Sequence, residues 1–170
     1  ERVNEYALLE YCIRQDLEER AYRRMAVLNP VKVIIENFPE NNTEYFDGPN
    51  HPAKPELGMR SVPLTREIYI EREDFMEDPP KKFFRLGPGR EVRLRYACYI
   101  TCTGFKKDEE GEIQEIHATF DPESRGGSTP DGRKVKGTIH WVSATENRPL
   151  EVRNYEQLFT KTNPEDVEEG

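Results

Sequence analysis

The chain has 170 residues, a length that suits one domain, or one domain with a fragment of another. Its hydrophobic content of 35% allows a modest core, and no apolar run approaches the ~20 residues that a membrane span needs. The net charge of -8 at pH 7, taken as a whole, speaks against nucleic acid as a partner.

The few cysteines and histidines restrict the redox and metal chemistry that the chain can perform. Cys12, Cys98 and Cys102 are an odd number without framework spacing, which indicates reduced thiols in a cytosolic compartment. We expect Cys98 and Cys102 to be core residues rather than metal ligands, because a zinc site needs closer pairs and more ligands. The first residues, "ERVNEYALLEYC", do not read as a signal peptide. We therefore predict a cytoplasmic protein without a metal site or membrane association.

The chain opens with a predicted helix over residues 3–22. Apolar residues recur there at spacings of three and four and form one stripe: Tyr6, Leu9, Ile13 and Leu17. Pro30 marks the break, and the β-branched run "VKVIIENF" (31–38) predicts a strand. Residues 39–64 are rich in proline and are expected to be irregular, and "REIYIER" (66–72) alternates as a strand does.

The clearest period in the sequence lies in "EVRLRYACYITCTGF" (91–105), which predicts one half-buried antiparallel strand. The side chains expected to point outward are Arg93, Arg95, Ala97, Tyr99, Thr101 and Thr103. A turn at 106–112 leads to a return strand, and two further strands follow the loop at 121–133. These strands are expected at 113–120 and 134–143, and the segment 149–159 begins as the third.

About five strands joined by turns, after one helix, predict a mainly β domain. The spacing suggests a small antiparallel barrel or sandwich, and periodicity alone does not choose between them.

The stretch "PPKKFFRLGPGREVRLR" (79–95) is basic, although the chain as a whole is acidic. Arg93 and Arg95 would project from one face of a strand, ~7 Å apart, and guanidinium binds phosphate or a base edge bidentately. Lys81, Lys82 and Arg85 accompany Phe83 and Phe84, a combination that suits single-stranded nucleic acid, with charge for the backbone and flat faces for stacking. For each residue alone, a solvated arginine or a core phenylalanine is the simpler interpretation; for the cluster we favour RNA binding.

Signals of catalysis are weak. The chain has no nucleophile elbow, no glycine-rich phosphate loop and no cluster of metal ligands. We expect His51 to tie its loop and His140 to be packed or hydrogen-bonded. Arg133, Lys134 and Lys136 in "DGRKVKG" form either a second patch that contacts the nucleic-acid backbone or a solvated hairpin.

Four segments together resemble the C-terminal anticodon-binding region of the glutaminyl-tRNA synthetase family, in the family's order and spacing. They are "CIRQDLEERAYRRMAVLNPVKVIIEN" (12–37), "PNHPAKPELGMRSVPLTREIYIEREDF" (49–75), "PPKKFFRLGPGREVRLRYA" (79–97) and "DGRKVKGTIHWVSA" (131–144). The resemblance implies an antiparallel β-barrel of the anticodon-binding type, preceded by one α-helix. It implies that residues 1–25 end a helical connector and that residues 26–170 form the anticodon-binding region, with 76–143 contributing to a distal barrel.

The resemblance also implies which residues contact RNA. Arg23 matches a base-contacting arginine after the connector helix, Arg85 an arginine at the third anticodon position, and Arg95 an arginine of the first-base pocket. Arg93 lies beside Arg95. Lys82 stands where another family member has Gln, and Phe84 stands where that member has a contacting Lys, so that Phe84 would stack instead of donating.

The expected partners are the anticodon loop of tRNA(Gln) and a catalytic domain of the same polypeptide. The His-Ile-Gly-His and Lys-Met-Ser-Lys-Ser signatures of class I synthetases do not occur in this chain. We therefore expect no catalytic residues and no cofactor here, with ATP and Mg²⁺ used by the parent ligase. Two alternatives stay open: the barrel of an archaeal or eukaryotic glutamyl-tRNA synthetase, and a non-catalytic β-barrel that binds protein.

Overall fold

The computed structural model describes residues 6–156. Residues 23–149 make one compact unit, and the helix α1 (Tyr6–Arg20) belongs to a second. None of the residues of α1 is buried, so the apolar stripe of the predicted helix is exposed to solvent; Leu9 and Ile13, for example, are 56% and 49% exposed. The described part of the predicted helix is therefore confirmed in type and close in length, whereas residues 3–5 lie outside the described residues. No helix within residues 6–156 has the length and apolar character that crossing a membrane requires.

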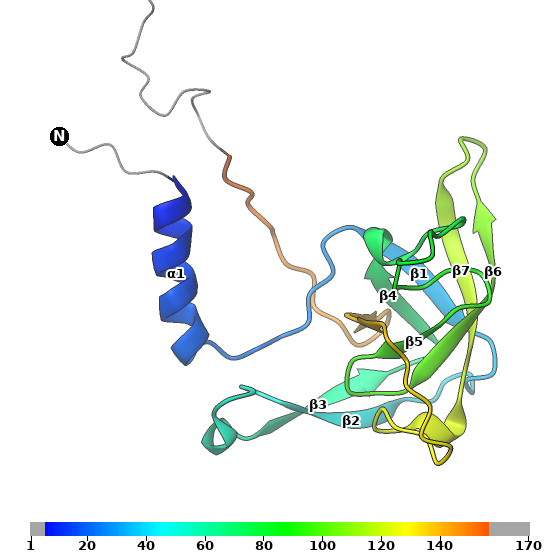
Figure 1. The fold of residues 1–170 in the computed structure, drawn as a ribbon, viewed down its shortest axis with the longest axis horizontal. Helices are drawn as coiled ribbons and strands as arrows, with labels where there is room; N and C mark the ends of the chain where they lie inside the picture. The colour runs from blue at the N-terminus through cyan, green and yellow to red at the C-terminus, as the bar shows by residue number, and fades with distance from the viewer. Residues whose placement is uncertain (1–5, 157–170) are drawn as a thin grey trace, which may run out of the picture. The chain divides into compact units, whose positions relative to one another are not determined.

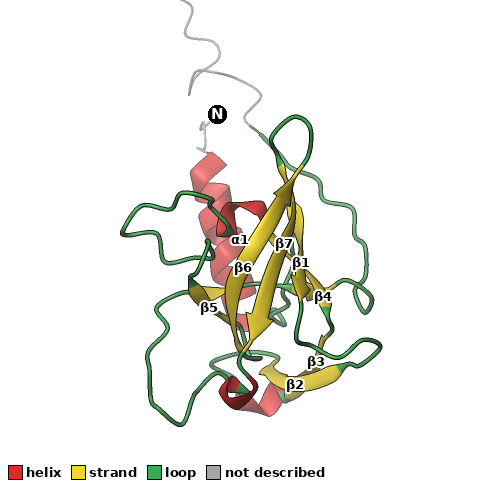
Figure 2. Ribbon diagram, turned by 90° about the vertical axis from the view of Figure 1, so that its right-hand side faces the viewer, coloured by secondary structure: helices red, strands yellow, loops and turns green. Residues whose placement is uncertain are grey.

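The larger unit is built around one curled seven-stranded sheet, in the order β8-β5-β6-β7-β1-β4-β9 (Figures 1 and 2). The strands are β1 (Pro30–Ile35), β4 (Glu67–Glu71), β5 (Glu91–Leu94), β6 (Tyr99–Lys107), β7 (Ile113–Phe120), β8 (Thr138–Ile139) and β9 (Val142–Ser143). Three short 3₁₀ turns lie at Pro55–Leu57, Arg72–Asp74 and Pro122–Ser124. The prediction of a mainly β fold with one preceding helix is confirmed.

The sheet is open in its hydrogen bonding, which corrects the expectation of a closed antiparallel barrel. Strands β8 and β9 are its two edges and do not pair with each other in the described chain. Two neighbouring pairs are parallel, β1 with β7 and β5 with β8, whereas the other pairs are antiparallel. Because only residues 140 and 141 separate β8 from β9, one continuous segment covers both edges of the curled sheet.

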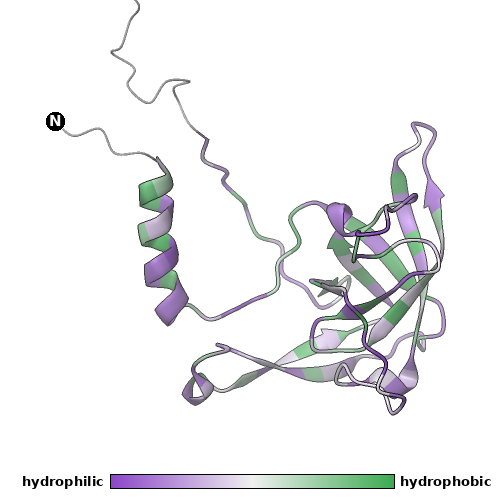
Figure 3. Cartoon of the chain, in the orientation of Figure 1, coloured by the Kyte–Doolittle hydropathy of each residue, from purple (hydrophilic) through white to green (hydrophobic). Residues whose placement is uncertain are grey.

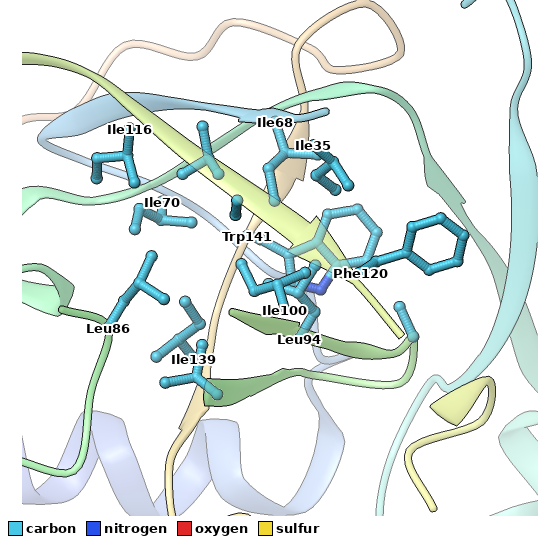
Figure 4. Packing of buried hydrophobic residues seen from close by; sticks show 14 of the residues in the cluster. Ile35, Ile68, Ile70, Leu86, Leu94, Ile100, Ile116, Phe120, Ile139 and Trp141 are labelled. Carbon is cyan, nitrogen blue, oxygen red and sulfur yellow. The ribbon is translucent and has the colours of Figure 1, made fainter. Parts of the chain in front are cut away.

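The core fills the concave side of this sheet with aliphatic side chains that alternate along the strands (Figures 3 and 4). Leu94, Ile139 and Trp141 lie close together there, and Trp141 is fully buried with its indole Nε1 donating to the carbonyl oxygen of Arg95 at 3.0 Å. Burying an indole requires such a partner for its N–H. Cys98 and Cys102 are buried as predicted, and burial raises the pKa of the Cys98 thiol to about 12, which keeps it protonated and unreactive.

Several predicted boundaries are wrong. The stretch 39–64 is not irregular, because β2 (Glu44–Pro49) and β3 (Met59–Leu64) pair as an antiparallel ribbon. Proline fits there because each strand of a two-stranded ribbon has an unpaired edge. The predicted strand 134–143 is reduced to β8 and β9, and residues 149–156 form no strand, while 157–159 lie outside the described residues.

Candidate nucleic-acid interface

The basic stretch 79–95 is held in place by one of its own arginines. The guanidinium of Arg90 donates to the carbonyl oxygens of Phe83 and Pro79, the latter at 2.8 Å. Gly87 allows the chain to pass close by, because a Cβ at that position would lie 2.9 Å from the carbonyl oxygen of Met76. Arg90 therefore acts as a structural tie, and it presents the remaining cations of the stretch on a defined loop.

The side chains of Arg93 and Arg95 project from the outer face of the β5 segment, as the alternation predicted. Val92 and Leu94 are buried on the inner face. The backbone N–H groups of Arg93 and Arg95 donate to Gly137 and Ile139 at 2.8 and 3.1 Å, which fixes both residues against β8.

The single strand predicted over 91–105 is wrong in one respect. The chain reverses after Leu94, whose N–H donates to the carbonyl oxygen of Cys98 at 2.8 Å. Tyr99 pairs with Arg93 on the outer face, as predicted, but it is 4% exposed because the loop after β7 covers it: its hydroxyl donates to the carbonyl oxygen of Gly127 at 3.1 Å.

The guanidinium of Arg93 is packed rather than freely extended. It lies 5.8 Å from the centre of the Tyr99 ring, and a Cβ at Gly127 would come within 2.6 Å of its Nε. Gly127 also has a φ of +82°, so this glycine is needed both for its backbone conformation and for the close approach. Arg93 forms no ion pair with a carboxylate of the described chain, and its charge is therefore not neutralised locally.

Arg95 lies beside the aromatic ring of Tyr96 at the β5–β6 turn. Its guanidinium carbon is 5.7 Å from the ring centre, and the guanidinium carbon of Arg60, on β3, is 5.5 Å from the same centre. Sequence reasoning did not identify Arg60 or Tyr96 as site residues. A φ of +71° at Tyr96 was invisible in the sequence, because tyrosine does not signal a left-handed conformation as glycine or asparagine does.

Arg85, a predicted site residue, is paired with a carboxylate. Its Nε lies 3.2 Å from Oδ1 of Asp74, and its Nη1 donates to the carbonyl oxygen of Glu73 at 3.3 Å. Burial raises the pKa of Asp74, and the charge of Arg85 opposes that rise. The side chain of Asp74 is 12% exposed whereas that of Arg85 is 50% exposed, so the guanidinium still faces solvent.

The pKa of His140 is influenced by the charges of both Arg95 and Asp74. Burial lowers the pKa of His140, the charge of Arg95 lowers it further, and Asp74 and Glu71 oppose both effects. Arg95 and the Arg85–Asp74 pair are therefore both near one imidazole. His140 is exposed as a residue although it is partly desolvated, so the expectation that it is packed or hydrogen-bonded stays a prediction. His51 does tie its loop: it is buried and its Nδ1 accepts a hydrogen bond from the N–H of Ala53.

Phe84 is an exposed aromatic residue in contact with a cation. It is 51% exposed, and the ammonium of Lys136 lies 5.1 Å from the centre of its ring. The two segments touch through their backbones as well, since Gly137 packs against the carbonyl oxygen of Phe84 with no room for a Cβ. Lys82 is exposed on the same loop, two residues before Phe84.

The remaining candidates lie elsewhere or are otherwise engaged. The backbone N–H of Arg23 donates to the carbonyl oxygen of Asn50 at 2.7 Å, which places Arg23 at the end of the β2–β3 ribbon. Arg133 does not join a second patch, because it forms ion pairs with three carboxylates: Glu91, Asp121 and Asp131. Of the predicted residues, the structure thus brings Phe84, Arg85, Arg93 and Arg95 to the neighbourhood of β5 and β8, with Lys82 on the adjoining loop.

The described residues contain no group of three or more His, Cys, Asp or Glu side chains that could hold a metal ion. What the arrangement offers is cationic and aromatic: guanidinium and ammonium groups beside exposed or half-exposed rings. Such groups bind the phosphates and unstacked bases of single-stranded nucleic acid.

The model of one protein family, described as "tRNA synthetases class I (E and Q), anti-codon binding domain", matches residues 21–121, and a second model with the same description matches residues 138–169. The chain belongs to this family of anticodon-binding domains.

Among curated relatives, it is 55% identical to the glutamine–tRNA ligase of Bradyrhizobium diazoefficiens, over 96% of this chain and 29% of that protein. It is 54% identical to the glutamine–tRNA ligases of Nitrosomonas europaea and Vibrio parahaemolyticus, over 93% and 99% of this chain and 29% and 30% of those proteins. The chain thus spans less than a third of the length of these relatives.

Proposed function

We propose that this chain is the anticodon-binding portion of a glutamine–tRNA ligase and that it recognises the anticodon loop of tRNA(Gln). The observation that carries the proposal is the match to proteins of that name along 93–99% of the chain. The surface at β5 and β8 supports it, because its cations and exposed rings suit an unstacked loop.

The proposed RNA contacts are those expected from the sequence. Arg85 and Arg95 read base edges in separate pockets, Arg93 and Lys82 contact the backbone beside them, and Phe84 stacks on a base. Arg23 contacts RNA from the neighbouring β2–β3 ribbon. The acidic net charge is compatible with this role because binding follows the local field rather than the sum of charges.

We propose further that the whole protein ligates glutamine to tRNA with ATP and Mg²⁺ in the cytoplasm, and that a catalytic domain of the same polypeptide performs the reaction. Residues 1–25 would end a helical connector, and residues 26–170 would form the anticodon-binding region. The contribution of 76–143 to a distal barrel stays a prediction.

The test is binding of the 170-residue chain to tRNA(Gln) and to the same tRNA with an exchanged anticodon, measured by gel retardation at several salt concentrations. We expect weak binding that prefers the native anticodon and weakens as salt rises. Equal binding of both RNAs would count against base reading.

A glutamyl-tRNA synthetase barrel is the second candidate, because the family description covers both the E and the Q enzymes. Aminoacylation by the full-length parent separates the two candidates, since the amino acid that it attaches defines the enzyme. A protein-binding β-barrel, the remaining alternative, would be favoured if no RNA bound at low salt while a protein partner was captured.

A further inference from the structure

The conformation of Tyr96 is unusual for a bulky side chain. Among the described residues, the non-glycine residues with positive φ are Asn41 and Tyr96, and asparagine tolerates this region well whereas tyrosine does not. Residues held in sparsely populated backbone conformations occur preferentially at functional sites, where the surrounding structure fixes them. The strain at Tyr96 therefore calls for an explanation in terms of what its ring does.

The ring of Tyr96 is fixed between two arginines and a glycine. A Cβ at Gly48, on β2, would lie 3.1 Å from Cδ2 of the ring, so the tyrosine packs on bare backbone. The guanidinium carbons of Arg60 and Arg95 lie 5.5 and 5.7 Å from the ring centre, within the range of a cation–π contact. One aromatic ring thus places a cation from β3 beside a cation from the β5–β6 turn.

The charges of these two arginines are not balanced by acids of the described chain. Neither forms an ion pair with a described carboxylate, in contrast to Arg85 and Arg133. Arg60 uses Nη1 to donate to the carbonyl oxygen of Pro49 at 2.6 Å, which orients its guanidinium without removing its charge. The guanidinium groups of two arginines that contact the same ring repel each other, and an anion bound beside them would offset this repulsion.

We infer that Arg60 is a further RNA-contacting residue, which binds a backbone phosphate of the anticodon loop beside the base that Arg95 reads, and that Tyr96 is a positioning residue, which holds Arg60 next to Arg95. This inference rests on the proposed function. For Arg60 a phosphate fits better than a base edge, because Arg60 approaches from β3 while Arg95 lies in the β5–β6 turn, and phosphate accepts hydrogen bonds from several directions. Asn50 connects the start of β3 to Arg23. Its side-chain Nδ2 donates to the carbonyl oxygen of Met59, and its backbone carbonyl oxygen accepts a hydrogen bond from the N–H of Arg23.

The experiment measures the affinity of the full 170-residue chain for the anticodon stem–loop RNA of tRNA(Gln) at a series of KCl concentrations. We expect Arg60→Gln to weaken binding about five-fold at low salt and to reduce the slope of log K against log salt by about 0.7, the loss of one phosphate contact on a single strand. The loss should be equal for the native and an exchanged anticodon. Arg66→Gln is the matched control, because Arg66 is another partly exposed arginine that donates to a backbone carbonyl, that of Phe38, and pairs with Glu40.

Tyr96→Asn removes the ring but keeps a residue that tolerates positive φ, so folding should be preserved. We expect this variant to bind RNA less tightly and to reduce the effect of a second substitution at Arg60, a non-additivity that a purely structural role would not produce. Tyr96→Phe should behave as the wild type.

The outcomes separate the inference from the proposed function. Two outcomes would overturn the inference alone. The first is an Arg60→Gln variant that binds RNA as tightly as the wild type with an unchanged salt slope. The second is additive effects of Arg60→Gln and Tyr96→Asn on RNA affinity. Failure of the wild-type chain to bind the stem–loop would overturn the proposed function and the inference with it.

Discussion

Arg85 and Asp74 form a partly exposed ion pair, with Arg85 Nε 3.2 Å from Asp74 Oδ1, at the edge of the proposed RNA-binding surface. An arginine proposed to read a base is thus paired with a carboxylate before RNA arrives. RNA bound as proposed would have to compete with this carboxylate or share the guanidinium with it, and we expect Asp74 to disfavour non-specific binding of phosphate.

Replacement of Asp74 by Asn tests this relationship. We expect Asp74→Asn to raise affinity for both native and exchanged anticodons by about two- to five-fold at low salt, the scale of a partly exposed ion pair. The measurement is the ratio of the two affinities by fluorescence anisotropy, and this ratio should fall. Weaker binding by the variant would mean that Asp74 positions Arg85 instead.

The same variant has a pH signature. The pKa of Asp74 is raised in the folded chain, mainly by burial, so its ionisation opposes folding. The contribution of this group to stability is therefore present at low pH and lost as the pH rises through the raised pKa. We expect Asp74→Asn to remove that loss, so that the variant gains stability relative to the wild type at neutral pH but not in acid; urea unfolding at the two pH values measures this difference.

Phe84 should contribute to RNA binding through the face of its ring. We expect Phe84→Leu to weaken binding of the stem–loop RNA by about 1 kcal/mol or more, because base–aromatic stacking is worth about 1–3 kcal/mol per base. Leucine keeps the apolar character and removes only the ring. Tyr45→Leu is the control, since Tyr45 is an even more exposed aromatic residue, on β2. An equal effect of both substitutions would contradict the stacking role.

Arg95 and Arg93 should differ in what their loss does. Arg95 is exposed, and we expect Arg95→Gln to relax discrimination at one anticodon base by about 1–3 kcal/mol with little change in thermal stability. Arg93 packs against Tyr99 and Gly127, so Arg93→Gln should lower both the melting temperature and RNA affinity. Parallel melting curves and binding titrations distinguish the two cases; a stability loss for Arg95→Gln equal to that for Arg93→Gln would contradict this assignment.

Arg133 should act on stability rather than on RNA. Its guanidinium lies over the Tyr99 ring at 5.4 Å, and its hydrogen bond is the largest cause of the lowered pKa of Asp121. We expect Arg133→Met to lower the melting temperature at neutral pH. Because a lowered pKa stabilises the folded state above the unfolded pKa and this stabilisation is lost as the pH falls, the difference from wild type should narrow in acid. A loss of RNA affinity at unchanged stability would instead place Arg133 in the interface.

The sequence predicted local features well and long-range pairings poorly. The alternation of Val92, Arg93, Leu94 and Arg95 was sufficient to place the two arginines on the outer face, because strand periodicity is a local property. The reversal after Leu94 was not predictable, since the apolar alternation continues through a turn that contains no glycine or asparagine. The β2–β3 ribbon was missed because its prolines read as loop signals.

The candidate site shows the same division. The cluster of cations around Phe84 was visible as composition, whereas the partners that decide the role of each cation are distant in sequence. Arg133 is 42 residues from Glu91, and Arg60, on β3, meets Tyr96, in the β5–β6 turn. Pairings of this kind depend on tertiary folding and leave no local pattern.

The continuous segment that covers both sheet edges also bears on how the protein is made. A nascent chain that ends before Thr138 leaves β5 and β4 with unpaired edges at the same time, and such edges are sites of aggregation. The six residues from Thr138 to Ser143 pair with both strands, leave only two-residue strands at the sheet edges, and bring Trp141 to the core. Both edge pairings and the core tryptophan therefore depend on one short segment, and we expect a chain truncated before Thr138 to lose all three together.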